Sequence, residues 1–332
     1  MKKVVVIKGD GIGKEVIPQA VRLLNQVTSD LELIPAHMGQ ECNAIYGWYL
    51  PPMTIELIKE SDSVLFGAIT TPIADPSYRS PLIYLRKEFD LFANVRPAKK
   101  IIPSLGIGDI DLVLVRENTE GMYTGLEREE ADGTVVLERR ISEKACRRIV
   151  RYAIDLCHRR GLTRIHCVHK ANVLRKSDGL FRRVFFEEVE GSGLEGREML
   201  VDATAAALIT KPREFQCIVT LNLYGDILSD EAAGLVGGLG FTPCGNIGDR
   251  HSVFEPCHGS APDIAGRGIA NPTATIMSGT MMLRHLQLCE EADAIEDALR
   301  RTFMEGFSTP DVGGRCSTVG FTDQIISRLD RR

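Results

Sequence analysis

The sequence predicts an α/β fold with a largely parallel sheet. Short apolar runs, as at residues 4–7 and 64–67, have the length of buried strands. Between them lie stretches with apolar residues at helical spacing, as at 15–27. Such alternation is typical of parallel sheets covered by helices, whose ligands bind where the strands end. We therefore expect the functional residues to follow directly after strands.

The composition describes an ordinary globular protein. The chain has 332 residues, 44% of them hydrophobic and 26% charged, and a formal net charge of -5. This length suffices for two domains or one large domain. Basic residues are scattered and no apolar run approaches transmembrane length, so we expect neither a nucleic-acid nor a membrane partner. The nine cysteines form no CxxC pair, which indicates reduced thiols and a cytoplasmic protein.

Three glycines follow the first strand. Gly9, Gly11 and Gly13 look at first like a dinucleotide-binding fingerprint, but the third glycine of that pattern would fall on Lys14. We therefore expect a tight turn into the helix 15–27 and assign no cofactor to it.

The alternation continues with strand 31–36, helix 53–59 and strand 64–67. Ser80 and Pro81 then start another helix, because a serine side chain caps the first free N–H groups and proline suits the first helical position.

Three arginines lie at or near strand ends. Arg86 falls on the helix after Pro81, Arg96 in the extended segment that follows, and Arg116 at the end of strand 112–115. Three guanidinium groups could hold a substrate with several carboxylates by bidentate pairing. For each arginine alone, an ion pair with a structural acid is an equally good interpretation.

A strongly charged segment, residues 127–140, predicts a β-hairpin. Asp132 and Gly133 are typical turn residues, and the following residues 134–137 have a strand pattern. A hairpin this polar offers little core to its own domain. We interpret it as an arm that pairs with another subunit, with a solvated hairpin as the alternative.

Two later strand ends also carry reactive side chains. Lys170 follows strand 163–168, and burial or nearby cations would lower its pKa as a general base requires. We interpret the neighbouring His169 as a structural hydrogen-bonding residue. Asp202 is expected to cap a helix after the next strand.

Asp226 and Asp230 are candidate metal ligands. The apolar run 217–221 leads to Gly225, and these two residues then lie four apart on one helix face. Two carboxylates at a helix N-terminus repel each other unless a cation or the helix dipole offsets their charge. Oxygen ligands suit Mg²⁺ or Mn²⁺ better than zinc. A capped helix with solvated acids is the alternative.

Four long motifs occur in order along the chain: VRENTEGMYTG (115–125), HKANVLRKSDGLF (169–181), GDILSDEAAGLVGGLG (225–240) and EPCHGSAPDIAGRGIANPTATI (255–276). Together they resemble the metal-dependent β-decarboxylating dehydrogenases, which comprise isocitrate, 3-isopropylmalate and homoisocitrate dehydrogenases. The resemblance covers essentially the whole chain, from GDGIGKEV to TPDVGG. It implies the fold of that family and the oxidative decarboxylation of a 3-substituted malate.

The resemblance also implies how the reaction is divided among residues. The divalent metal, Mg²⁺ or Mn²⁺, would be bound by Asp226 and Asp230 together with Asp202 of the partner subunit. Lys170 of the partner subunit would relay the hydroxyl proton while hydride leaves for the nicotinamide. Tyr123 would protonate C3 after CO₂ is lost. The substrate carboxylates would be held by Arg86, Arg96 and Arg116. Such a shared site makes a homodimer the smallest active unit, with a tetramer as a larger alternative.

The implied cofactor segment is the loop that begins at Glu255. The matching residues are Glu255, His258, Gly259, Ser260, Ala261, Asp263, Ile264 and Asn271. NADP-dependent members of the family carry a basic residue at the position of Asp263. A carboxylate there can accept both ribose hydroxyls and would repel a 2′-phosphate, so we expect NAD.

The two domains implied by the resemblance are discontinuous in sequence. The first, on the NAD-binding side, would consist of residues 1–92 and 238–332 and contain the largely parallel sheet. The second, residues 93–237, would hold the metal ligands and the dimer contacts, with the arm at about 124–141 crossing to the other subunit.

Residues 79–83 are expected to meet the substituent at C3 of the substrate. Archaeal homoisocitrate dehydrogenases carry a basic residue, a serine and a proline here. We therefore expect Ser80 and Arg79 at the distal carboxylate of homoisocitrate, with Leu82 and Ile83 along its methylenes, and 2-oxoadipate as product. 3-Isopropylmalate is a close alternative, because the same aliphatic pair would suit an isopropyl group, and isocitrate is the third.

Relatives of two other kinds are weighed against this prediction. Some are non-catalytic regulatory subunits, and a more distant group with the same fold transfers acyl groups. Since Tyr123, Lys170 and the three aspartates are all present, both alternatives are disfavoured.

Overall fold

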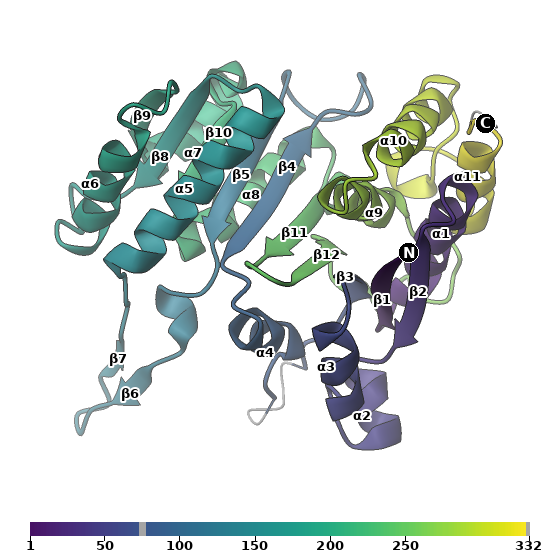
Figure 1. Cartoon of the computed structure of the whole chain (residues 1–332), viewed down its shortest axis with the longest axis horizontal. Coiled ribbons are helices and arrows are strands. Elements are labelled where there is room, and N and C mark those ends of the chain that lie inside the picture. The colour runs from purple at the N-terminus through teal and green to yellow at the C-terminus, as the bar shows by residue number, and fades with distance from the viewer. Residues whose placement is uncertain (73–77, 330–332) are drawn as a thin grey trace.

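One ten-stranded sheet runs through the molecule (Figure 1). The structure, a computed structural model, describes residues 1–72 and 78–329. In space the strands follow the order β2 (Leu31–Ala36), β1 (Lys2–Gly9), β3 (Ser63–Ala68), β12 (Ser252–Pro256), β11 (Pro243–Ile247), β4 (Ala93–Lys99), β5 (Asp111–Glu117), β10 (Cys217–Thr220), β8 (Arg164–His169) and β9 (Glu195–Leu200). Neighbours pair in parallel except β12 with β11, β11 with β4, and β4 with β5. The predicted α/β fold with a mostly parallel sheet is therefore confirmed.

Helices cover both faces of this sheet. One face packs against α1 (Gly13–Val27), α5 (Glu143–Arg160), α6 (Ser177–Val189), α9 (Thr273–His285), α10 (Cys289–Met304) and α11 (Thr318–Ile326). The other face packs against α3 (Pro52–Lys59), α4 (Pro81–Glu88), α7 (Val201–Thr210) and α8 (Asn222–Val236). Successive side chains of β1 point to opposite faces of the sheet. Val4 and Val6 therefore belong to the core on the α1 side, while Val5 and Ile7 belong to the core on the α3 and α4 side.

Serine side chains cap two of the helices, and the first of these, α4, begins where the sequence predicts it. Ser80 caps α4 by accepting the N–H of Ile83 at 3.4 Å, and Pro81 is the first helical residue. Ser142 caps α5 by accepting the N–H of Ala145 at 3.2 Å.

The helix α2 (Gln40–Tyr46) has no counterpart among the predicted elements. Its start is stabilised by Asp10, whose carboxylate accepts the N–H groups of Gln40 and Glu41 at 2.9 and 3.1 Å. The same carboxylate accepts the N–H of Thr70 at 2.9 Å. The capping group thus comes from a distant part of the chain, which no local pattern reveals.

The glycine turn after β1 is tight, as predicted. Gly9 and Gly11 adopt φ values of 71° and 53°. A methyl group on Gly9 would lie 1.8 Å from the carbonyl oxygen of Ala68, and one on Gly11 would lie 2.0 Å from that of Ser260. The protein's own backbone therefore fills the space beside both glycines.

The predicted domain boundary falls inside the sheet. β4 belongs to residues 93–237 and pairs with β11 of residues 238–332, so that Val95 lies opposite Gly245. Hydrogen bonds between strands therefore join the two predicted domains, and their division stays a prediction.

The predicted hairpin is confirmed and projects from the body of the molecule (Figure 1). Within the described residues, β6 (Glu127–Glu129) and β7 (Val135–Leu137) pair only with each other. Gly133 makes the turn with a φ of 85°. Val135 is 64% exposed and Leu137 36%, so the hairpin buries little against its own chain.

Two predictions from composition can also be compared with the structure. All nine cysteines are free thiols, as expected. Among the helices of residues 1–72 and 78–329, none has the length and apolar character needed to cross a membrane.

Candidate active site

Asp226 and Asp230 lie one turn apart on α8, with side chains 32% and 55% exposed. The helix begins at Asn222, so the prediction that they lie at its N-terminus is wrong, because Asp226 belongs to the second turn. Gly225 is inside the helix, where a methyl group would lie 2.6 Å from Cβ of Arg116. This glycine therefore leaves room for the arginine side chain to cross the helix.

Two buried arginines contact these aspartates. Arg96 of β4 donates to Asp230 at 2.8 Å and approaches Asp226 at 3.4 Å. Arg116, at the end of β5 and 1% exposed, donates to Asp226 and, at 2.7 Å, to the side chain of Asn222. Both arginines form ion pairs with acids, as the alternative interpretation in which each arginine pairs with a structural acid expects. Those acids are the predicted metal ligands, so the structure brings two parts of the predicted site together.

The surrounding charges shift the two carboxyl pKa values in opposite directions. Burial alone would raise the pKa of Asp226, but the charge of Arg116, a hydrogen bond from Tyr123 and the charge of Arg96 outweigh it and lower that pKa. Burial raises the pKa of Asp230, opposed by Arg96 and reinforced by Asp226. The two carboxylates therefore differ in how firmly they are held ionised.

Tyr123 joins the same cluster from the segment after β5. Its O–H donates to Oδ2 of Asp226, and the guanidinium carbon of Arg116 lies 5.1 Å from the centre of its ring. Burial raises the pKa of Tyr123, and the hydrogen bond to Asp226 adds to this rise. At neutral pH the phenol is therefore a protonated donor, as a proton source must be.

A buried chain of polar side chains links Arg96 to the end of β12. Arg96 donates to Asn94 at 2.8 Å, and the amide of Asn94 donates to Asn246 at 2.8 Å. Asn246 donates to Glu255 at 2.7 Å, which Arg86 approaches at 3.4 Å. Sequence reasoning missed both asparagines. The only local signal is an amide within a short buried strand.

Lys170 and Asp202 form a separate pair. Lys170 follows β8 directly, and its ammonium group donates to Asp202 at 2.6 Å. The prediction that Asp202 caps a helix is wrong, because α7 begins at Val201 and Leu200 occupies the cap position with an extended backbone. Asp202 lies instead in the first turn, with its side chain 64% exposed.

Asp226 and Asp230 fit part of a divalent-metal site. They offer two oxygen donors on one helix face, the donor type that Mg²⁺ and Mn²⁺ prefer, and neither side chain is fully buried. In residues 1–72 and 78–329, no three His, Cys, Asp or Glu side chains gather closely enough to hold a metal. Within one chain Asp202 does not join the pair, so further donors have to come from substrate, water or a second subunit.

The predicted cofactor segment follows β12 and packs on the glycine turn. The carbonyl of Ser260 accepts the N–H of Ile12 at 2.9 Å, and its hydroxyl lies 2.7 Å from that of Thr70. Glu15 in the first turn of α1 accepts the N–H of Gly268 at 2.9 Å. The start of α1 thus fixes the loop at two places.

Three polar side chains along this loop, those of His258, Asp263 and Asn271, have different surroundings. Nδ1 of His258 lies 3.0 Å from the carbonyl oxygen of Gly259, while its Nε2 is buried and has no hydrogen-bond partner among the described residues. Asp263 is exposed. Asn271, at the far end, donates to Asp311 at 3.0 Å. The exposed carboxylate of Asp263 is accessible to a ligand, whereas the unpaired nitrogen of His258 is enclosed by the protein.

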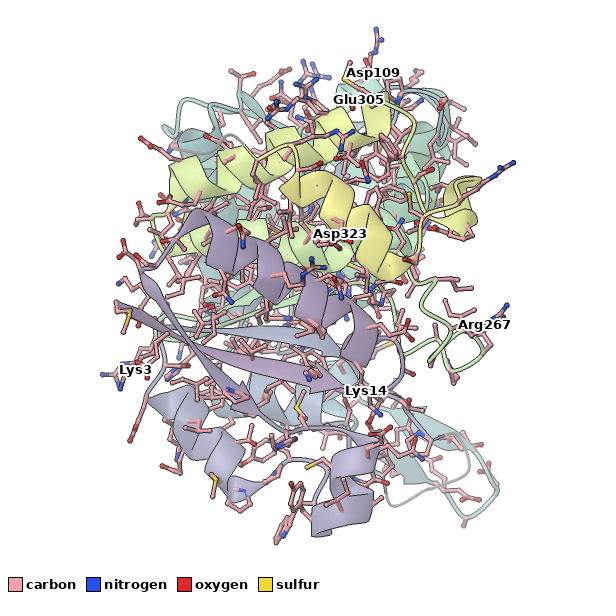
Figure 2. The ribbon with its side chains drawn as sticks, turned by 90° about the vertical axis from the view of Figure 1, so that its right-hand side faces the viewer. Lys3, Lys14, Asp109, Arg267, Glu305 and Asp323 are labelled. Atoms are coloured by element: carbon pink, nitrogen blue, oxygen red, sulfur yellow. The ribbon has the colours of Figure 1, made fainter. Side chains whose placement is uncertain are left out.

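The apolar members of the segment pack inward. Ala261 and Ile264 lie against a small cluster that contains Ile12. Figure 2 shows the loop with Arg267 projecting from the body of the molecule beside the region of Lys14. The loop is thus anchored by these apolar side chains and by the buried Ser260, whereas Asp263 is exposed.

The predicted specificity residues surround the start of α4. Arg79 donates to the carbonyl of Tyr78 at 3.0 Å. Leu82 is half-buried against the core beneath α4, whereas Ile83 is 37% exposed and lies three residues before Arg86. Ile83 is therefore the more accessible apolar side chain of the pair, and it shares a helix face with an arginine.

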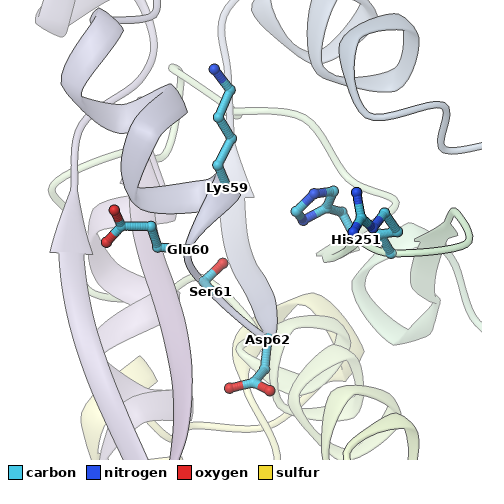
Figure 3. A pocket seen from close by; sticks show the side chains of 6 residues that line it. Lys59, Glu60, Ser61, Asp62 and His251 are labelled. Atoms are coloured by element: carbon cyan, nitrogen blue, oxygen red, sulfur yellow. The ribbon is translucent and has the colours of Figure 1, made fainter.

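A separate cavity of about 450 Å³ lies at the other ends of β3 and β12 (Figure 3). It is lined by Lys59, Glu60, Ser61, Asp62, Arg250 and His251. These residues precede the two strands, whereas Glu255 lies at the end of β12. The lining has both signs of charge, and none of it belongs to the predicted site.

The fold, with arginines and carboxylates gathered at its strand ends, is typical of an enzyme that acts on a small anionic substrate. The family model for isocitrate/isopropylmalate dehydrogenase matches residues 3–326. The chain belongs to this family, as the resemblance implied. It is a β-decarboxylating dehydrogenase that acts on a CH–OH group, and members of the family generally depend on NAD or NADP and on a divalent metal.

Named relatives divide between substrates. The chain is 48% identical over 331 residues to the 3-isopropylmalate dehydrogenase of Methanothermobacter thermautotrophicus, covering 99% of this chain and 98% of that protein. It is 46% identical over 349 residues to the homoisocitrate dehydrogenase of Methanocaldococcus jannaschii, covering 100% and 99%. The crystal structure of isocitrate dehydrogenase from Methylococcus capsulatus matches with a TM-score of 0.95 and 38% identity, covering 100% of both chains.

Proposed function

We propose that this chain catalyses the NAD- and metal-dependent oxidative decarboxylation of a 3-substituted malate, with homoisocitrate converted to 2-oxoadipate. The observation that carries the proposal is a cluster of arginines and aspartates. Arg96 donates to Asp230 and Arg116 donates to Asp226. Tyr123 also donates to Asp226. A substituted malate brings carboxylates for the guanidinium groups. It also brings a hydroxyl beside a carboxylate, which is the chelating unit that a divalent metal needs.

The residues of the cluster divide the chemistry. Arg86, Arg96 and Arg116 hold and orient the substrate carboxylates. A bound Mg²⁺ or Mn²⁺ supplies Lewis-acid charge where oxygen becomes more negative during the reaction. Tyr123 delivers its proton to C3 after CO₂ has left, and Asp226 orients the phenol by accepting its O–H.

A second subunit completes the site, and we propose a homodimer as the smallest active unit. Lys170 of the partner subunit would accept the hydroxyl proton when bound NAD serves as hydride acceptor, and Asp202 of the partner subunit would add a third carboxylate. The pair is accessible to a neighbour, because the Asp202 side chain is 64% exposed. The hairpin supports the same assembly, since its apolar residue Val135 is 64% exposed and would be covered by a second subunit.

We propose NAD as the oxidant because of Asp263. This carboxylate is exposed on the loop after β12, where it can accept hydrogen bonds from ribose hydroxyls. The 2′-phosphate of NADP would face the same negative charge. NADH formation should therefore exceed NADPH formation at equal cofactor concentration.

Homoisocitrate is the proposed substrate because of Ser80 and Ile83. Ser80 accepts the capping N–H of Ile83 at 3.4 Å, and a hydroxyl can also donate a hydrogen bond to a distal carboxylate. Ile83 offers aliphatic surface beside Arg86. The relative with 48% identity favours 3-isopropylmalate as the alternative, which would use Ile83 without Ser80.

The test is NADH formation with Mg²⁺, giving kcat/KM for homoisocitrate, 3-isopropylmalate and isocitrate. Ser80→Ala should lower kcat/KM for homoisocitrate by roughly ten- to hundredfold and change that for 3-isopropylmalate by no more than about twofold. Ser80→Gly removes the hydroxyl at little cost to the cap and should show the same loss, whereas Ser80→Thr keeps both and should retain activity with homoisocitrate.

The outcomes separate the candidates. If kcat/KM is highest for 3-isopropylmalate and Ser80→Ala leaves this preference intact, the substrate is 3-isopropylmalate rather than homoisocitrate. Removal of divalent metal by a chelator should abolish turnover, and added Mg²⁺ or Mn²⁺ should restore it. Turnover that survives chelation, or none with any of the three substrates, would refute the proposed reaction.

A further inference from the structure

Asp178, on α6, is a buried carboxylate for which the proposed reaction has no use. Its side chain is 0% exposed. It accepts hydrogen bonds from the N–H of Lys170 at 2.7 Å, the O–H of Tyr224 at 3.0 Å and the guanidinium of Arg139 at 2.5 Å. A buried carboxylate is costly unless donors pair it, and these donors come from three separate segments. Asp178 therefore joins the end of β8, α8 and the base of the hairpin.

The bond to Lys170 fixes the backbone from which the lysine side chain extends. The N–H of Lys170 donates to Asp178, and the next N–H, of Ala171, donates to Nδ1 of His169 at 3.1 Å. His169 is held in turn by Glu198, 3.1 Å from its Nε2. Two successive N–H groups at Lys170 thus have fixed acceptors.

The loop between β8 and α6 closes on this same contact. Residues 170–178 begin with the N–H of Lys170 and end with the side chain of Asp178 that accepts it. Inside the loop, Leu174 donates its N–H to the carbonyl of Lys170 at 2.8 Å, and Asp178 donates its own N–H to the carbonyl of Leu174 at 3.0 Å. Removing the carboxylate would release the first of these constraints.

The two other donors attach neighbouring elements to the same carboxylate. Arg139 follows β7, and its guanidinium carbon lies 5.5 Å from the centre of the Tyr224 ring. Burial, together with the charge of Asp178, raises the pKa of Tyr224 to about 12, so its O–H stays a donor. Tyr224 belongs to the helix that carries the proposed metal ligands. Asp178 is therefore placed to affect two active sites, its own and that of the partner subunit.

We propose that Asp178 is a positioning residue for Lys170, and that it thereby serves the active site of the partner subunit. The inference rests on the proposed function, in which Lys170 acts in that site. Asp178 also accepts from the hydroxyl of the adjacent Ser177 at 3.4 Å, but only its bond to Lys170 reaches a residue that takes part in the proposed proton transfer. Misplacing such a group by about 1 Å costs on the order of 10²-fold in rate.

The first test compares the kinetics of full-length Asp178→Asn and Asp178→Glu. In both variants kcat should fall by roughly ten- to hundredfold, while KM for NAD⁺ changes by no more than about twofold. The KM for NAD⁺ should stay nearly unchanged because the proposed cofactor segment follows β12, and four strands separate β12 from β8 in the sheet: β11, β4, β5 and β10. Asp178→Glu keeps a negative charge beside Arg139, so a loss in this variant does not come from an unpaired buried arginine.

Tyr224→Phe is the matched control, because it removes one donor to Asp178 and leaves the Lys170 bond intact. It should keep kcat within about threefold of the unmodified enzyme. A loss in Tyr224→Phe as large as that in the Asp178 variants would overturn the proposal, since the carboxylate would then act through α8.

Mixed dimers decide in which site Asp178 acts. Consider a dimer of one Asp178→Asn subunit and one Asp226→Asn subunit. In one of its two sites, α8 comes from the Asp178→Asn subunit and has an intact Asp226. The same site receives Lys170 from the Asp226→Asn subunit, in which Asp178 is intact. Differently tagged subunits allow this dimer to be purified. We expect it to regain about half of the kcat per dimer of the unmodified enzyme, because one of two sites is restored.

A control dimer separates this inference from the proposed function. Lys170→Met paired with Asp226→Asn should regain activity to the same extent, because the intact lysine and the intact aspartate meet in one site. If this control stays inactive, the shared site is wrong irrespective of Asp178. If the control regains activity and the Asp178→Asn mixture does not, Asp178 acts within its own site and the inference is overturned.

Discussion

Replacing Gly225 by alanine tests whether the close approach of α8 holds Arg116 in place. The added methyl group would lie 2.6 Å from Cβ and from Cγ of Arg116, and 3.2 Å from its Cδ. Carbon atoms in ordinary contact are separated by about 3.5–4.0 Å. Arg116 has little freedom to yield, because its guanidinium group is bound to Asn222 and Asp226 and the residue is 1% exposed.

Two opposing effects set the stability of Gly225→Ala. Alanine in place of glycine stabilises a helix interior by about 1 kcal/mol. A methyl group forced into a filled interior costs about 1–3 kcal/mol. The variant should therefore be up to about 2 kcal/mol less stable than the unmodified protein. Its kcat/KM should fall by roughly ten- to hundredfold, since a hydrogen bond to a charged group contributes about 1.5–3 kcal/mol and the displaced guanidinium loses its alignment.

Gly234 in the same helix provides the matched control. Among the described residues, no atom outside the helix lies within 4 Å of a methyl group placed there. Gly234→Ala should thus gain about 1 kcal/mol from helix propensity alone and keep its kcat/KM. Urea unfolding and steady-state kinetics measure both variants. If Gly225→Ala gained the same stability as Gly234→Ala at full activity, the close packing against Arg116 would be refuted.

Two further predictions concern pH and assembly. Burial, reinforced by the charges of Arg197 and Arg164, lowers the pKa of His166 from 6.5 to about 4. Neutral His166 therefore contributes its full stabilisation above about pH 6.5, and up to about 3 kcal/mol of the unfolding free energy is lost as the pH falls towards 4. Urea unfolding at pH 7 and pH 4.5 should show a smaller loss of unfolding free energy in His166→Gln than in the unmodified protein. Equal losses in the two proteins would contradict the assignment to His166. Val135→Glu, at a residue 64% exposed on the hairpin, should change the unfolding free energy of the isolated chain by less than about 0.5 kcal/mol but weaken the dimer. Sedimentation velocity and activity after dilution measure this, and a fully active monomer would contradict the shared site.

The parts of the fold that could be predicted are those set by neighbouring residues. The alternation of apolar runs and helical stretches predicts the mostly parallel sheet, and Ser80 with Pro81 predicts the start of α4, because these signals act within a few residues. The hairpin around Gly133 follows from its turn sequence in the same way.

The features that were missed depend on contacts between distant residues. Asp10 stabilises the start of α2 from 30 positions away. Asn94 and Asn246 come from β4 and β11, 152 positions apart, and meet only because these strands are neighbours. α8 begins earlier than predicted, at Asn222, whose side chain is bound by Arg116 of β5. Tertiary contacts of this kind leave no periodic signal in the sequence.

The metal and catalytic assignments depended on the family resemblance rather than on spacing. Two aspartates four apart are compatible with a solvated helix face, and the structure adds the arginines and Tyr123 that surround them. The location of Lys170 and Asp202 away from this cluster agrees with the expectation of a second subunit, which stays a prediction.

The pairing of β3 with β12 determines when this protein can complete its fold on the ribosome. Ser63 and Ser252, which share a hydrogen bond at 3.0 Å, are 189 positions apart. While the intervening segments are being synthesised, β1, β2 and β3 can associate, but β3 presents an unpaired edge in the growing chain. Such an edge is prone to pairing with other nascent chains. The edge of β3 therefore stays unpaired until Ser252–Pro256 has been synthesised, and this enzyme is most exposed to strand-to-strand association during that interval.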